Sequence, residues 1–150
     1  MSITKWIIYV VVLLGACLSG CANTTLQGDS PPKVVIDIAN VSYPTKLGTY
    51  CWQEKCVDTS GPIDMLKESE PMKVRTGETI KLKMEVELPP TSMELSILNE
   101  NEEKISMELQ DFHFAAPTQK GIYYFSFSLR WQKDNISIGD ALYAFALEVD

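Results

Sequence analysis

The chain has 150 residues, of which 45% are hydrophobic, and its 13 Lys and Arg face 20 Asp and Glu for a formal net charge of −7. This acidity argues against nucleic acid or anionic lipid as a partner of the protein surface, because both carry phosphates that would be repelled. The length allows one domain that buries a hydrophobic core without structural metals.

The first 20 residues have the parts of an export signal. Lys5 gives a short leading region its single basic charge, and an apolar run over residues 6–18 follows it. A transmembrane helix needs about 20 apolar residues, so this run is too short to stay in the membrane. Small residues then lead to Cys21.

The tetrapeptide Leu18-Ser19-Gly20-Cys21 resembles the lipobox of bacterial lipoproteins. The resemblance implies cleavage before Cys21, transfer of diacylglyceryl to its thiol and acylation by a fatty acid such as palmitate. Two acyl chains hold a protein stably at a membrane, at about 0.8 kcal/mol per buried CH₂. We expect a lipid-anchored protein on the extracytoplasmic face of the cell membrane; the alternative is a secretory signal with an incidental cysteine.

Residues 21–33 are polar and show no apolar periodicity. They predict a flexible tether that lifts the domain off the lipid surface. The folded domain is expected over residues 34–150.

In residues 34–150 the apolar side chains recur with a period of two, which is typical of strands with one buried face. The clearest runs are 34–38, 79–88, 93–97, 105–109, 121–131 and 142–149. In the run 121–131, Phe127 is expected to face the core and Ser126 and Ser128 to face solvent. Residues 62–68 predict a single helical turn crossing between sheets, with Pro62 at its first position. The pattern predicts an all-β fold, a two-sheet antiparallel sandwich.

The last third of the chain resembles the closing strands of immunoglobulin-like bacterial sandwiches, such as copper-resistance periplasmic proteins. The resemblance covers residues 115–149 and is carried by Pro117, Gly121, Tyr123, Trp131, Gly139 and Phe145. It implies an immunoglobulin-like sandwich. Copper handling in that family needs His and Met ligands near the chain start and in the last loop. The single histidine here, His113, lies mid-chain, so we expect no metal and no cofactor.

Cys51 and Cys56 are the cysteines that remain beside the signal residue Cys17 and the anchor Cys21. An even pair in an exported chain predicts a disulfide closing a tight loop, with a redox pair or a metal site as alternatives. The stretch 48–52, with Cys56 and Asp58, resembles small Gram-positive surface lipoproteins, a resemblance that implies no activity.

Tyr50 and Trp52 flank Cys51 and are the candidate binding residues. A disulfide-stiffened loop could display both rings to a partner, since rigid aromatic side chains favour binding. Alternatively, Trp52 caps one end of the sandwich and packs against the disulfide.

No motif indicates catalysis. His113 lies between two phenylalanines, which favours a packing role, and no Gly-x-Ser-x-Gly turn is present. The acidic segment 99–103 lacks the glycine of a calcium loop and predicts a solvated hairpin tip. We therefore expect a non-catalytic binding module for a protein, peptide or cell-wall component. The alternatives are a solute-capture protein, a hydrolase accessory or a protease inhibitor that presents a loop.

Overall fold

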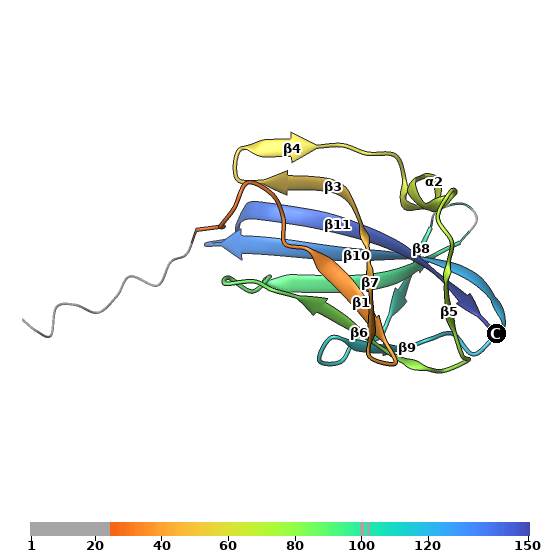
Figure 1. Cartoon of the computed structure of the whole chain (residues 1–150). Helices are drawn as coiled ribbons and strands as arrows, with labels where there is room; N and C mark the ends of the chain where they lie inside the picture. The colour runs from red at the N-terminus through yellow and green to blue at the C-terminus, as the bar shows by residue number, and fades with distance from the viewer. Residues whose placement is uncertain (1–24, 100, 102) are drawn as a thin grey trace, which may run out of the picture.

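The structure is a computed structural model that describes residues 25–99, 101 and 103–150. The described part is an all-β sandwich of two sheets with one short helix (Figure 1), so the predicted fold class is confirmed. The predicted signal and Cys21 lie outside the described residues. Within the described part, no helix has the length and apolar character needed to cross a membrane.

The smaller sheet has four strands. Their spatial order is β2 (Val41–Pro44), β1 (Val34–Ile38), β6 (Thr79–Met84) and β9 (His113–Ala115). All neighbours in this sheet are antiparallel.

The larger sheet has seven strands. Six follow the order β4 (Lys55–Val57), β3 (Lys46–Trp52), β11 (Ile136–Val149), β10 (Gly121–Lys133), β7 (Ser92–Leu98) and β8 (Lys104–Met107). The seventh, β5 (Met72–Val74), runs parallel to the end of β11. The order β1-β6-β9 opposite β11-β10-β7-β8 is that of the A-B-E and G-F-C-C′ strands of an immunoglobulin domain.

Three phenylalanines join the sheets. Phe125 and Phe145 lie opposite each other on β10 and β11 and stack with ring centroids 4.8 Å apart. Phe114 on β9 reaches across from the smaller sheet to within 5.5 Å and 6.1 Å of these two rings. All three side chains are buried. The aromatic cluster therefore occupies the middle of the sandwich, where apolar burial contributes most.

Two predicted strands differ most from the structure in their bounds. The strand expected over residues 79–88 ends at Met84, although Val86 and Leu88 stay half-buried. Two prolines follow Leu88, and since proline cannot donate to a ladder, the chain leaves the sheet before them. The carbonyl of Leu88 instead accepts a hydrogen bond of 2.8 Å from Trp131 Nε1. The last strand begins at Ile136 rather than at residue 142.

The helix α2 (Pro62–Leu66) has Pro62 in its first turn, as predicted. The expectation that it crosses between sheets is wrong, because β4 before it and β5 after it both belong to the larger sheet. Leu66 packs on Ala144 and Ala146 and covers part of that sheet's outer face.

Ser126 lies on the same outer face, opposite Ala144. The prediction that it meets solvent is wrong, since it is 1% exposed, while Ser128 is half-buried.

The facing of β10 can be tested by two substitutions. Phe127→Ala is expected to lower the free energy of unfolding by about 3–5 kcal/mol, because Phe127 is fully buried. Ser126→Ala should leave it unchanged or raise it by about 1 kcal/mol, since the buried hydroxyl has no hydrogen-bond partner among the described residues. Denaturation followed by circular dichroism measures both. A tolerated Phe127→Ala beside a damaging Ser126→Ala would reverse the assigned faces.

Candidate functional site

Residues 26–32, which the sequence assigns to a tether, pack onto the sandwich. Leu26 is 8% exposed and belongs to the core cluster. Gln53 Nε2 donates to the carbonyls of Leu26 and Gly28 at 3.1 Å and 3.0 Å, and Trp52 Nε1 donates to the Gly28 carbonyl at 3.0 Å. The packed part of the chain therefore includes Leu26 and extends ahead of residue 34, where the domain was expected to start.

Gly139 explains why Leu26 fits. A Cβ at this position would lie 2.6 Å from Leu26 Cδ1 and 3.2 Å from Trp52 Cε3, closer than carbon atoms pack. The absent side chain of Gly139 thus leaves the space that Leu26 fills. A single leucine in a polar stretch has no periodicity, so the sequence carried no signal for this contact.

Tyr143 fixes the other end of this segment. Its hydroxyl donates to the carbonyl of Pro32, and burial raises the pKa of Tyr143 above its usual value near 10. The folded state therefore retains a proton that the unfolded state loses above that value. Stability from this group is full below pH ~10 and falls as the pH rises further.

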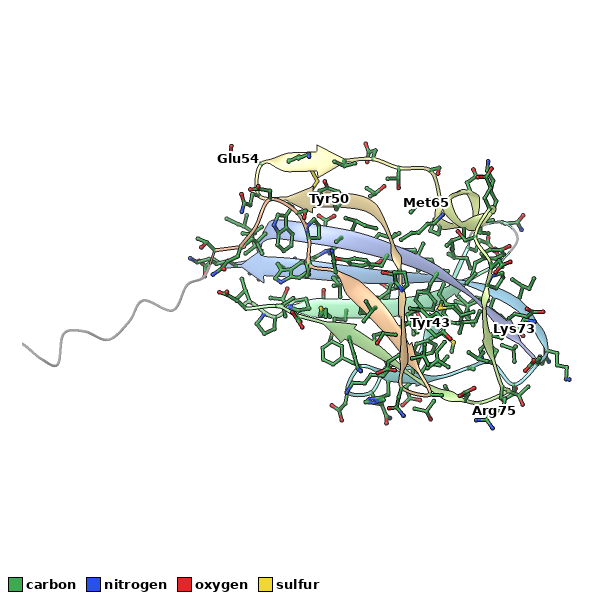
Figure 2. The ribbon with its side chains drawn as sticks, viewed as in Figure 1. Tyr43, Tyr50, Glu54, Met65, Lys73 and Arg75 are labelled. Carbon is green, nitrogen blue, oxygen red and sulfur yellow. A yellow bond between two sulfur atoms is a disulfide. The ribbon has the colours of Figure 1, made fainter. Side chains whose placement is uncertain are left out.

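The predicted disulfide is confirmed. Cys51 on β3 pairs directly with Cys56 on β4, with Cα atoms 4.1 Å apart (Figure 2). The turn between these strands consists of Gln53 and Glu54, and Gln53 has a left-handed φ of 56°. The bridge links the two strands of this hairpin, in which Trp52 is buried and the turn residues Gln53 and Glu54 are exposed.

The two candidate binding aromatics face inward to different degrees. Trp52 is 5% exposed and meets Trp131 edge-on with centroids 4.9 Å apart. Tyr50 is half-buried and packs against the core (Figure 2). Trp52 therefore lies in the core, which removes it from any exposed binding surface. The exposed residues around the turn of this hairpin are Gln53, Glu54, Lys55 and Cys56.

A groove of about 1030 Å³ lies over the outer face of the smaller sheet, and the sequence analysis did not identify it. The side chains that point outward from β1 and β6, including Val35, Lys81 and Lys83, form its floor. The remaining lining consists of Leu82 and Met84 of β6, Ser42 of β2, and the flanking residues Lys33, Glu85, Val86, Pro89, Pro90 and Phe112. Three distant parts of the chain meet here.

Phe112 lines the groove from a strained position. Asp111 and Phe112 form a two-residue turn with φ of 47° and 65°, closed by reciprocal hydrogen bonds between Gln110 and His113 of 2.9 Å and 2.7 Å. Such turns favour Asn and Gly, and a bulky residue with positive φ is an outlier. Strained backbone conformations are often found at functional sites, so the position of Phe112 supports the groove as a candidate site.

His113 lies beside the groove, paired with Lys81 across β9 and β6. Its Nδ1 lies 2.7 Å from the carbonyl of Asp111, which it reaches as the tautomer that donates. The acidic segment forms the β7–β8 hairpin tip, where Asn99 Oδ1 accepts from the amides of Asn101 and Glu103. Among the described residues, no group of three His, Cys, Asp or Glu side chains is placed to hold a metal ion.

Comparison of the chain with family models, curated protein sequences and solved structures finds no match. The groove and the hairpin are therefore interpreted from their own chemistry.

The seating of Leu26 against Gly139 can be tested by a double-mutant cycle. Gly139→Ala is expected to cost about 1–3 kcal/mol, because the new methyl displaces Leu26. Leu26→Ala alone should cost about 2–3 kcal/mol. The double variant should lose less stability than the sum of the two, since alanine at position 26 leaves room for the methyl. Additive losses in thermal or urea denaturation would show that Leu26 does not fill this space.

Proposed function

We propose that the protein is an exported lipoprotein, anchored through Cys21, whose sandwich binds an anionic ligand without catalysing a reaction. The lipobox Leu18-Ser19-Gly20-Cys21 supports the anchor. The groove over the smaller sheet is the observation that carries the binding role.

The charge of the groove favours an anion. Three lysines line it against a single glutamate, although the chain as a whole has a net charge of −7. Lys83 pairs with Asp37, whereas no ion pair among the described residues involves Lys33 or Lys81. Both of these lysines are exposed, so their ammonium groups are available to a carboxylate, sulfonate or phosphate.

The walls of the groove favour a ligand that also has an apolar part. Phe112, Pro89 and Pro90 line the same space as the lysines. Small-molecule sites combine apolar walls with a few polar groups in volumes of about 300–1,000 Å³. A volume of about 1030 Å³ lies just above that range, which is close enough to favour solute capture as the second candidate function beside a protein or cell-wall partner.

Two fluorescent probes distinguish the contribution of the lysine charges from that of the apolar walls. The mature domain should bind 8-anilinonaphthalene-1-sulfonate saturably. Lys33→Gln with Lys81→Gln should weaken that binding about fivefold or more, through the loss of two partly exposed charge contacts. The uncharged analogue N-phenyl-1-naphthylamine should bind equally well before and after these changes. Fluorescence titration measures all four affinities.

A matched control comes from lysines outside the groove. Lys104→Gln with Lys120→Gln removes the same charge from exposed positions and should leave both affinities unchanged. Equal weakening by the two pairs would mean that net charge, not the groove, attracts the sulfonate.

Phe112→Gly removes the aromatic wall at a backbone conformation that glycine adopts freely. It should weaken both probes while preserving the circular dichroism spectrum. Unchanged binding of both probes in this variant would contradict the groove as the site.

The anchor has a separate test. Cys21→Ala should leave the precursor uncleaved or release the domain into the medium, because no thiol remains to receive the diacylglyceryl group. Fractionation and mass spectrometry of the N-terminus follow the product. Normal cleavage with full retention on membranes would contradict lipid anchoring at Cys21.

A further inference from the structure

The chain between the proposed lipid anchor and the folded domain is very short. Leu26 is held in the core, and only five peptide steps separate it from Cys21. Even fully extended, five residues span at most about 18 Å. The domain therefore has little freedom to leave the surface on which Cys21 is anchored.

One end of the sandwich is adjacent to Leu26. Gly139, which borders Leu26, pairs with Trp52 next to the β3–β4 turn. The β10–β11 turn at Asp134 and Asn135 follows within a few residues on the same strands. Figure 1 shows both turns at the end where the described chain begins, and Figure 2 places Glu54 there, far from Arg75.

The opposite end lies a full strand length away. β10 runs from Gly121 to Lys133, and 13 residues at about 3.3 Å each span about 40 Å. This distance is more than twice the longest reach of the chain between Cys21 and Leu26. An anchored lipid at Cys21 can therefore lie close to the near end of the sandwich but cannot reach the opposite end.

We propose that the end formed by the β3–β4 and β10–β11 turns lies against the membrane, with the strands directed away from it. The occupant of this surface is the bilayer that carries the acylated Cys21, and the inference rests on the proposed anchoring. The sandwich stands on its near end, because the chain enters the domain there and the connection to Cys21 is shorter than the strands are long.

The most exposed large apolar side chain of the described residues fits this placement. Ile136 is 67% exposed, and it immediately follows the β10–β11 turn. A single exposed isoleucine is ordinary on a protein surface. At an end held next to lipid, however, it meets the headgroup region and not bulk water.

A fluorescence transfer experiment tests the orientation with the lipidated, full-length mature protein in phosphatidylcholine vesicles that carry a headgroup acceptor. Donors are attached at Ser137→Cys, near the proposed membrane end, or at Thr118→Cys, in the loop before β10. Both native residues are exposed, small hydroxyl side chains, so the pair is matched. Transfer should be several-fold more efficient from position 137 than from position 118.

A spacer variant supplies the control. Twenty Gly and Ser residues inserted between Asn23 and Thr24 add a root-mean-square reach of about 25 Å. They should reduce transfer from position 137 most and bring the two positions closer together. If they leave both efficiencies unchanged, the short connection does not set the position of the domain.

Vesicle flotation separates failure of the orientation from failure of the anchor. Protein that does not float with vesicles overturns the lipid anchor, and the orientation with it. Protein that floats but gives equal transfer from both positions overturns the orientation alone.

Discussion

The pairing of β10 with β11 is the constraint on which the other contacts depend. Their antiparallel register extends from Gly121 opposite Val149 to Lys133 opposite Ile136, with one irregularity after Trp131. The inward side chains of this hairpin form the aromatic half of the core. Its outer edges carry β7 on one side and β3 and β5 on the other. The adjoining register of β11 with β3 sets Gly139 beside Trp52 and so leaves the space for Leu26.

The sequence predicts the parts of the fold in which burial alternates. On β1, β6 and β10, every second side chain enters the core, so a period of two identifies them. A residue that is buried by an element outside its own sheet shows no such period in the sequence. Ser126 is buried on the outer face of a sheet that α2 partly covers, and Leu26 is buried because a glycine far along the chain leaves space. Such contacts depend on tertiary placement that local sequence does not encode.

The candidate site was predictable only in part. The disulfide was predicted from the cysteine count and the expected export, which together leave Cys51 and Cys56 for pairing. The groove had no sequence signal, because Lys33, Lys81 and Phe112 come from separate segments and each has an ordinary role in isolation. For Trp52, in contrast, the sequence did contain a signal, but that signal pointed to the wrong role. Its position beside a disulfide suggested display, yet its indole fills the core and bonds to the segment 27–28.

The burial of Leu26 also bears on the proposed maturation of the protein. If Cys21 is the lipid anchor, processing enzymes must gain access to the peptide bond before it and then to its thiol. Once Leu26 has docked beside Gly139, only five peptide steps separate Cys21 from a residue held in the core. Cleavage and acylation are therefore expected to precede this docking, which makes closure of that end of the sandwich a late step in biogenesis. A precursor that folds too early would hinder its own processing.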